Sequence, residues 1–114
     1  MKKLISAAIL VIGVFGCKST EPLYYYGGFN TAVYSYFKAD EVSAEQQITI
    51  LQEVIQKAAA HSKPVAPGVH AHLGMLYFET GNTELGRQHF DQEKLLFPES
   101  KQYIDFLLKS SKAA

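Results

Sequence analysis

The chain has 114 residues, 47% of them hydrophobic, and its 11 lysines and arginines balance its 11 aspartates and glutamates. This length leaves room for one small domain, and the balanced charge excludes a nucleic-acid binder driven by bulk charge. A single cysteine excludes a disulfide-stapled mini-protein, and seven tyrosines with seven phenylalanines exclude a disordered chain.

The first 16 residues have the pattern of a secretory signal peptide. Two lysines precede an apolar run over residues 4–15, which is shorter than the roughly 18 to 20 residues that a transmembrane helix needs. Val14, Gly16 and Cys17 resemble a bacterial lipobox, after which the lipidated cysteine becomes the first residue of the mature chain. We therefore predict a cleaved signal peptide at residues 1–16 and lipidation at Cys17. The alternative is that Cys17 is an ordinary small apolar residue.

The lipobox resemblance also implies a location. Lys18 rather than aspartate follows the cysteine, which is similar to the default signal for sorting lipoproteins to the outer membrane of Gram-negative bacteria. Acyl chains such as palmitate would anchor the protein in the membrane, with a binding free energy of about 0.8 kcal/mol per buried methylene, and the domain would face the periplasm. Once Cys17 is lipidated, the chain has no other thiol for metal binding or catalysis.

Residues 17–29 comprise the lipidated cysteine, a polar tether and an aromatic segment. The segment contains Tyr24, Tyr25, Tyr26 and Phe29 beside two glycines. Tyrosine-rich patches are frequent anchors at protein interfaces, so Tyr24, Tyr25 and Tyr26 are candidate partner-binding residues. The segment is equally compatible with folding back to cover the first pair of helices.

Residues 30–114 are predicted to form an all-α domain. A first helix is expected from Phe29, because apolar residues follow it at helical spacings, at Val33, Tyr36 and Phe37. This pattern ends at residues 39–40.

A capping box predicts where the second helix begins. Ser43 is followed three residues later by Gln46, the spacing at which the two side chains cap each other's backbone. The expected core face of this helix consists of Ile48, Leu51, Ile55 and Ala58. Pro64 disfavours helical geometry at the residue before it, so the helix ends near residues 61–63.

Proline, glycine and asparagine mark the remaining helix ends. Pro67 suits the first position of a third helix over residues 68–79, because its missing N–H is not needed there, and Gly81 is a natural left-handed cap after that helix. A fourth helix is expected from Asn82 or Thr83 to Pro98, and Ser100 is expected to cap a fifth. The sequence therefore predicts about five helices, joined by short loops as antiparallel hairpins.

The third and fourth expected helices resemble a tetratricopeptide repeat over residues 67–100. The matching positions are Leu73, Gly74, Tyr77, Gly81, Gly86, Phe90 and Pro98. In this pattern the glycines let two helices approach closely and the large apolar residues fill the space between them. His70 stands where the repeat often has tryptophan, and Glu93 where it has a small residue. Residues 33–66 have the length of a preceding, poorer repeat.

The repeat resemblance implies an interaction surface. In tetratricopeptide modules the first helix of each hairpin lines a concave groove, and the corresponding exposed positions here are Ala71, Met75, Phe78 and Glu79. Met75, Phe78 and Glu79 are therefore candidate partner-binding residues, since methionine and phenylalanine suit a groove for an apolar segment. The alternative is that Met75 and Phe78 are core residues packed against the first helix.

The polar residues show no pattern typical of catalysis or metal binding. His70 and His72 are two positions apart, about 200° around a helix, so they cannot chelate one metal as an i, i+4 pair can. The carboxylates are expected to lie on solvated helix faces: Glu79, Glu84, Asp91, Glu93 and Asp105. We therefore expect no catalytic residue, no metal and no cofactor, and a protein that is not an enzyme.

The chain as a whole resembles a family of small bacterial lipoproteins that carry a domain of unknown function. The resemblance rests on four stretches, at residues 23–25, 63–68, 70–74 and 97–100. Such lipoproteins tend to be encoded beside relatives of the curli-secretion-channel lipoproteins, which implies a protein partner in an outer-membrane assembly and no nucleic-acid partner. The expected function is a periplasm-facing interaction adaptor in an envelope or export assembly, and the alternative is a lipoprotein that binds cell wall or a small ligand.

Overall fold

The computed structural model of the protein describes residues 23–38 and 42–113, and this part of the chain is all-helical. It contains five α-helices and one short 3-10 helix: α1 (Phe29–Lys38), α2 (Ala44–Ala60), α3 (Val69–Glu79), α4 (Thr83–Leu96), η1 (Pro98–Ser100) and α5 (Lys101–Ala113). The described residues form no strand, only an isolated parallel bridge between Tyr25 and Val65. The predicted all-α fold with five helices is confirmed. The predicted signal peptide, Cys17 and residues 39–40 lie outside the described residues.

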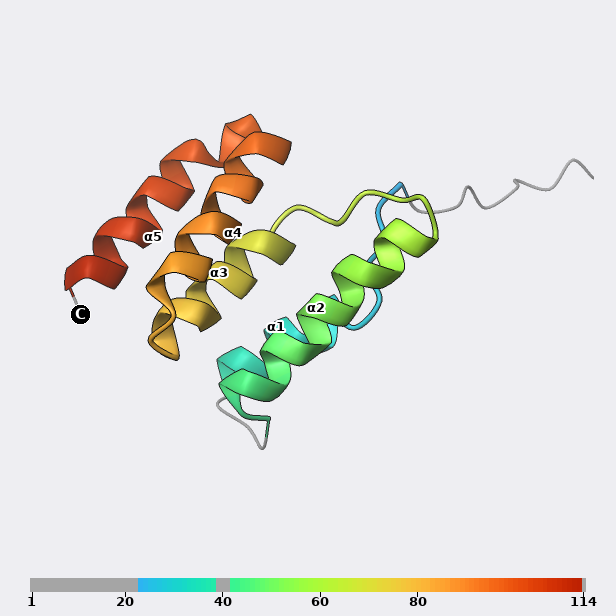
Figure 1. Ribbon diagram of the computed structural model, residues 1–114, viewed down its shortest axis with the longest axis horizontal. Helices are drawn as coiled ribbons and strands as arrows, with labels where there is room; N and C mark the ends of the chain where they lie inside the picture. Colours follow the sequence, from blue (N-terminus) through green and yellow to red (C-terminus); the bar gives the residue numbers. More distant parts are fainter. Residues whose placement is uncertain (1–22, 39–41, 114) are drawn as a thin grey trace, which may run out of the picture.

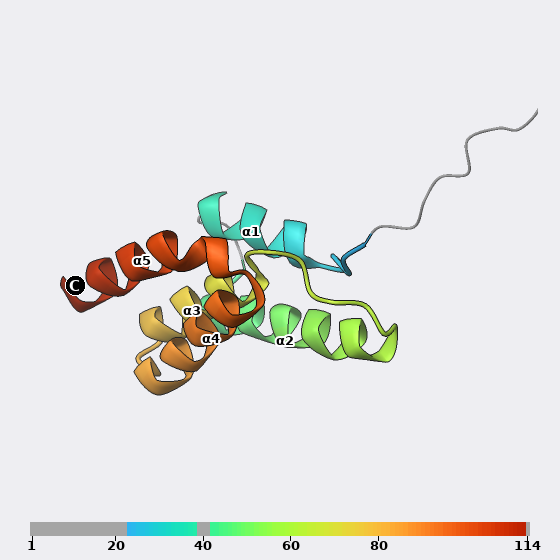
Figure 2. The ribbon, with the colours of Figure 1, turned by 90° about the horizontal axis from the view of Figure 1, so that it is seen from above.

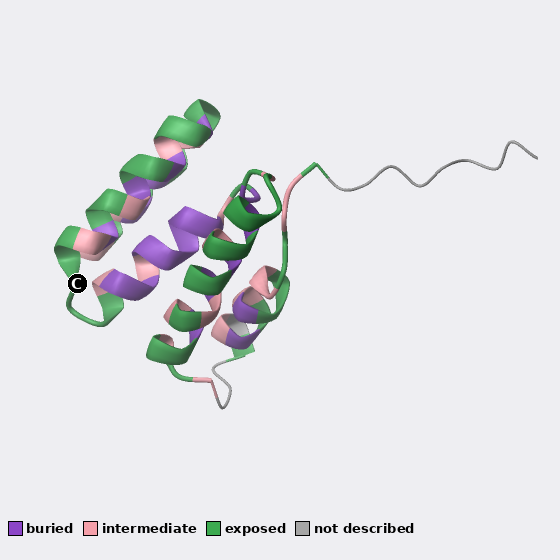
Figure 3. Cartoon of the chain, turned by 45° about the vertical axis from the view of Figure 1, so that its right-hand side comes forward, coloured by how far each residue is buried: buried purple, intermediate pink, exposed green. Residues whose placement is uncertain are grey.

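The helices follow one another across the molecule as two hairpins and a final single helix. The α1/α2 pair lies beside the α3/α4 pair, and α5 covers the far side of α3 and α4 (Figure 1). Seen from above, α1 and α5 flank one side of this stack, and α2 and α4 lie on the other (Figure 2). Helix α3 therefore lies in the middle, which explains why most of its residues are buried (Figure 3).

Three apolar clusters hold the helices together. The first joins Leu51 of α2 to Leu73 and Leu76 of α3, and the second joins the end of α2 to the loop that leads into α3. The third joins α3 and α4 to α5 through Phe90 and Ile104, both fully buried. Burying one such side chain contributes about 1.5 to 3 kcal/mol, so each interface rests on a few large residues.

The capping box at the start of α2 is present. The Ser43 N–H donates to Oε1 of Gln46 at 3.0 Å, and the Gln46 N–H donates to Oγ of Ser43 at 3.2 Å. The predicted core face of α2 was partly wrong, because its buried residues are Gln47, Leu51, Val54 and Ala58. Ile48 and Ile55 are only half-buried, since the side of α2 that meets α3 is centred on Leu51 and Val54.

Helix α3 begins at Val69, two residues later than it would with Pro67 as its first residue. Gly68 is the N-cap, with a φ of 98° in the left-handed region, so Pro67 lies outside the helix and the prediction for it was wrong. The end of α3 agrees with the prediction. Gly81 has a φ of 87°, its N–H donates to the Phe78 carbonyl, and the next N–H donates to the Tyr77 carbonyl, which together form a Schellman cap.

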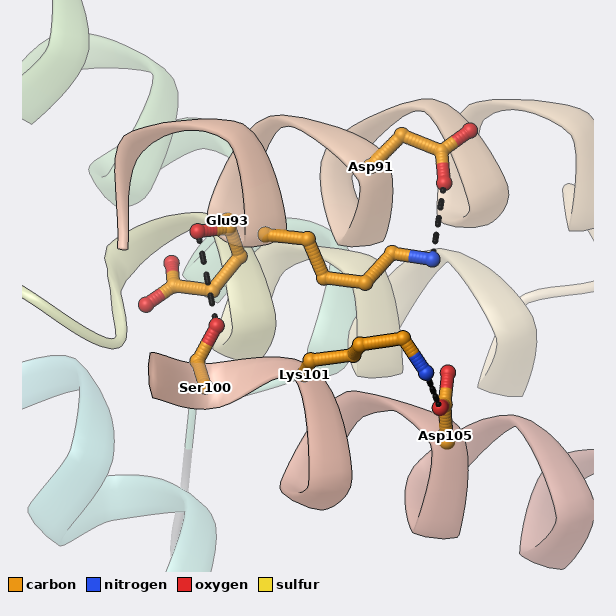
Figure 4. Close-up of polar contacts among 6 residues, drawn as sticks. Asp91, Glu93, Ser100, Lys101 and Asp105 are labelled. Atoms are coloured by element: carbon orange, nitrogen blue, oxygen red, sulfur yellow. Dashed lines mark hydrogen bonds and ion pairs between the residues drawn. The ribbon is translucent and has the colours of Figure 1, made fainter. Parts of the chain in front are cut away.

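The junction between α4 and α5 differs from the predicted cap. Ser100 does not cap α5: its hydroxyl donates backwards to the Phe97 carbonyl at 2.6 Å and more weakly to the Glu93 carbonyl (Figure 4). Pro98 opens the short 3-10 helix, which turns the chain directly into α5. The chain reverses here without a loop, so the hydroxyl satisfies carbonyls at the end of α4 rather than N–H groups at the start of α5.

Helices α3 and α4 approach each other at two glycines. A Cβ built on Gly74 would lie 2.6 Å from the ring of Phe90 and 3.0 Å from the carbonyl oxygen of Gly86. A Cβ on Gly86 would lie 2.6 Å from the ring of Phe78 and 3.1 Å from the carbonyl oxygen of Gly74. The two phenylalanine rings stack on each other at 5.3 Å. Any larger residue at either glycine would force the helices apart.

Candidate functional site

An apolar groove runs along α3, between α1 and α5, and we call it the α3 groove. It consists of a pocket of about 400 Å³ near the start of α3 and one of about 250 Å³ near its end. Both pockets are lined by Met75 and Leu107, so they adjoin. The other lining residues are Phe29, Val33, Tyr36, Gly68, Ala71, His72, Phe78, Glu79, Tyr103, Phe106, Ser110 and Ser111.

The three helices around the groove run in the same direction. Phe29 at the start of α1 lines the same pocket as Gly68 at the start of α3, and Tyr36 near the end of α1 bonds to Glu79 at the end of α3. Along α5, Tyr103 lies with Gly68, whereas Ser110 lies with Glu79. The C-terminal ends of α1, α3 and α5 are therefore at the same end of the groove.

Helix α5 gives the groove an aromatic rim. Tyr103 is 54% exposed and Phe106 is 62% exposed, although both side chains line the groove. They are one turn apart, beside the buried stripe of Ile104 and Leu107 that attaches α5 to the core. Large exposed aromatic side chains beside an apolar hollow mark an interaction site more often than a plain surface.

The polar groups of the groove gather near its Glu79 end. The Tyr36 hydroxyl donates to Oε1 of Glu79 at 2.6 Å, and this hydrogen bond, together with burial and the negative charge of Glu79, raises the pKa of Tyr36 to about 12. The His72 ring meets the Tyr36 ring edge-on at 5.0 Å. Burial lowers the pKa of His72, so its ring is neutral at pH 7, and its Nε2 is buried without a hydrogen-bond partner. Glu79 is thus the charged group among the lining residues.

The three predicted partner-binding residues of α3 line the groove, but they differ in exposure. Met75 and Phe78 are half-buried lining residues, and Glu79 is exposed at the end of the groove. Ala71 is only 4% exposed, so its expected exposure was wrong: α5 packs over it. The alternative core position of Met75 and Phe78 against the first helix was also wrong, because both pack on the cluster that contains Phe90 of α4 and residues of α5.

The three tyrosines of the aromatic segment do not line the groove, whereas Phe29 of the same segment does, and the segment folds back on the helices. Tyr24 meets the ring of Phe97 edge-on at 6.0 Å, and Tyr25 stacks on His61 at 5.1 Å. The Tyr25 N–H donates to the Pro64 carbonyl at 3.0 Å. Tyr26 is 41% exposed, so it is the tyrosine of this segment whose side chain is most available to a partner.

Two histidines, buried His70 and half-buried His89, stack between α3 and α4. The His70 and His89 rings lie 5.2 Å apart, with their Nδ1 atoms 3.0 Å from each other, so one ring donates its proton to the other. Tyr77 also stacks on His89, at 5.4 Å, and accepts a hydrogen bond from Gln52. Burial, together with the neighbouring His89, lowers the pKa of His70 to about 4. Neither ring faces the α3 groove, and the stack is a packing contact.

Glu93 is buried, so its expected position on a solvated helix face was wrong. It is 2% exposed and lies at the start of α3 (Figure 4). Its carboxylate accepts the Gly68 N–H at 2.7 Å and the Ala71 N–H at 3.2 Å. Burial raises the pKa of Glu93, and these hydrogen bonds oppose the rise. A helix that begins at a glycine has no side-chain cap of its own, so Glu93 of α4 caps α3 instead.

The described residues contain no group of three or more metal-ligating side chains that are placed to hold an ion. None of the helices in the described ranges combines the length and apolar character that are needed to span a bilayer.

The fold and groove define a small all-helical domain in which parallel helices enclose an apolar surface. Residues 23–107 of the chain match the domain of unknown function DUF4810, and the chain belongs to this family. The match begins at the aromatic segment and ends within α5. Neither the curated proteins nor the solved structures compared with the chain gave a match.

Proposed function

We propose that this protein is a lipid-anchored adaptor that faces the periplasm and holds a partner protein in the α3 groove. The observation that carries the proposal is the groove itself. It is apolar along most of its length, and it is bordered by Tyr103 and Phe106, which are 54% and 62% exposed. A surface of this kind is stabilised when a partner covers it, because about 25 cal/mol is gained per Å² of apolar surface buried.

The tetratricopeptide resemblance supports this position for the site. In such modules the first helix of each hairpin lines the binding surface, and α1, α3 and α5 occupy the corresponding places here. The lysine and asparagine that clamp a C-terminal carboxylate in chaperone-binding modules are absent, with Ala71 and Met75 in their positions. The charged lining residue is Glu79, which repels a carboxylate. A peptide C-terminus is therefore a poor ligand.

The anchor and the location are part of the same proposal. Lipidation at Cys17 would hold the protein at the outer membrane, and the resemblance to lipoproteins encoded beside secretion-channel relatives suggests the partner. We propose a protein of the same envelope or export assembly, such as a secretion-channel-like lipoprotein. The adaptor needs no cofactor and no catalytic residue for this role.

The alternative, a lipoprotein that binds cell wall or a small ligand through its tyrosines, has less structural support. The rings of Tyr24 and Tyr25 already contact Phe97 and His61, so they offer only part of their surface as a stacking platform. The α3 groove, in contrast, is open and apolar. For this reason we place the adaptor first.

Photo-crosslinking in cells tests the adaptor proposal. A photoreactive residue at Phe106 would be compared with one at Leu95, which is 72% exposed on α4 and does not line the groove. We expect one discrete membrane-protein adduct from Phe106, none from Leu95, and loss of the adduct in the mislocalised Cys17→Ser variant. Equal adducts at both positions, or adducts to cell wall alone, would refute the proposal.

A further inference from the structure

We infer that the α3 groove binds an amphipathic helix of about three turns, which lies antiparallel to α3 and carries a basic residue at the Glu79 end. This inference rests on the proposed function, because it specifies the part of the partner protein that enters the groove. Four properties of the groove carry it: the engaged hydroxyls of its lining, its length, the shared direction of its helices, and the position of its charge.

The lining favours a helix over an extended segment. An extended segment must find partners for its own N–H and C=O groups, whereas a helix satisfies them internally. The hydroxyls at the Glu79 end are already engaged: Ser110 donates to the Phe106 carbonyl at 3.0 Å, and Ser111 donates to the Leu107 carbonyl at 2.8 Å. The Tyr36 hydroxyl donates to Glu79. The groove therefore offers an apolar surface but few free hydrogen-bonding groups.

The length of the groove sets the length of the occupant. The lining residues of α3 extend from Gly68 to Glu79. At 1.5 Å per residue this stretch is roughly 16 Å long, which is about three turns of a bound helix. Such a helix would present apolar residues at spacings of three and four to Met75 and the aromatic rim.

The charge of the groove sets the direction of the occupant. The C-terminal ends of α1, α3 and α5 each carry a partial negative charge and lie at the same end as the Glu79 carboxylate. An antiparallel helix brings its N-terminal partial positive charge to that end. A basic side chain in its first turn then pairs with Glu79.

The lysines of the neighbouring helices leave this end of the groove negative. Neither Lys38 nor Lys109 lines the groove. Lys38 is two positions from Tyr36, about 200° around α1 from that lining residue, and Lys109 is four positions from Asp105, whose carboxylate it attracts. Lys38 instead lies over the ring of Tyr34, 4.9 Å from its centre. At the other end, Lys101 pairs with Asp105 at 2.7 Å (Figure 4).

Crosslinks from two positions on α5 test the inference on the full lipidated chain. Tyr103 and Ser110 are both exposed and line opposite ends of the groove, roughly 10 Å apart along the helix. Mass spectrometry of each adduct would identify the captured residue of the partner. We expect captured residues about seven positions apart, with the Ser110 partner N-terminal to the Tyr103 partner and a lysine or arginine within one turn of it.

The outcomes separate this inference from the adaptor proposal. Captured residues only about three positions apart would indicate an extended segment, because a strand rises about 3.3 Å per residue, and the reverse order would indicate a parallel helix. Either result overturns the inference and leaves the adaptor standing. Absence of a partner adduct from Tyr103, Ser110 and Phe106 would overturn both.

A charge variant tests the basic residue separately. Glu79→Gln should lower the yield of the Ser110 adduct about two- to five-fold, the range that one exposed ion pair supplies. Glu84→Gln is the matched control, because Glu84 is exposed on α4 and does not line the groove. Equal yields from the two variants would exclude a basic residue opposite Glu79.

Discussion

The close approach of α3 and α4 predicts that Gly74→Ala destabilises the protein, although alanine is the better helix former. Helix propensity alone would make the variant about 1 kcal/mol more stable. The new methyl group, however, would lie 2.6 Å from Phe90 Cδ1 and 3.0 Å from the Gly86 carbonyl oxygen. Phe90 is fully buried and stacked on Phe78, and the second contact is backbone, so neither neighbour moves freely.

The size of the effect follows from this geometry. The helices must separate by roughly 0.9 Å for the methyl group to reach the optimum carbon contact of about 3.5 Å, and a gap of that size forfeits a quarter to a half of each affected contact. Overpacking of this kind costs about 1 to 3 kcal/mol. After subtracting the propensity gain of about 1 kcal/mol, we expect a net loss of up to about 2 kcal/mol, or up to about 16 °C in Tm for a domain of this size.

Urea and thermal unfolding followed by circular dichroism would measure the loss. Gln88→Ala, on the exposed side of α4, is the control and should change the free energy of unfolding by less than about 0.5 kcal/mol. The double variant with Gly86→Ala should lose less than the sum of the two single variants, because the first methyl group already separates the helices. A Gly74→Ala variant that is more stable than the natural chain would refute the close-packing interpretation.

Three further predictions follow from the polar groups of the structure. Glu93→Ala should cost about 2 to 4 kcal/mol in denaturant unfolding, because the Gly68 and Ala71 N–H groups lose their acceptor, whereas a loss below 1 kcal/mol would show that water replaces it. Folding lowers the pKa of His70 from 6.5 to about 4, so protonation of this ring favours the unfolded chain. The free energy of unfolding should therefore be highest above pH 6.5 and should fall towards pH 4, by up to about 1.4 kcal/mol per pH unit. Glu93, whose pKa is raised, opposes this pH dependence. His70→Gln should make the free energy of unfolding less dependent on pH, and an unchanged pH dependence would show that His70 is not its cause. Tyr36→Phe should lower the free energy of unfolding by less than about 1 kcal/mol, since the hydrogen bond from Tyr36 to Glu79 is exposed to solvent. A larger loss in the same assay would contradict the weak contribution expected of this bond.

Local sequence signals determined where most helices begin and end. Ser43 and Gln46 specify their capping box through side chains only three residues apart, and Gly81 supplies the left-handed residue that ends α3. These signals act within one turn of the chain, so the sequence alone reveals them. The capping prediction for Ser100 failed because the packing of α5 against α4, not the local sequence, decides which groups its hydroxyl reaches.

Long-range contacts explain what the sequence did not reveal about the site. Glu93 has the composition of a solvated helix residue, and its burial depends on the start of α3, 22 or more positions away in the chain. The exposure of Tyr103 and Phe106 was equally hidden, because both have the helical spacing of core residues. The sequence of α5 did contain one indication of this exposure. Ile104 and Leu107 already form an apolar stripe along the helix, so two more aromatic residues exceed what one face of α5 can bury.

The sequence by itself determined the all-α class, most helix ends and the signals that predict a lipid anchor, because each depends on residues close together in the chain. Only the tertiary structure decided which side of α3 stays open, which charge lies in the groove and which residues form its rim. Three helices from separate parts of the sequence must lie in parallel before Met75, Glu79 and Phe106 share one surface. That arrangement depends on packing at Gly74 and Gly86 and on the seating of α5, which periodicity does not specify.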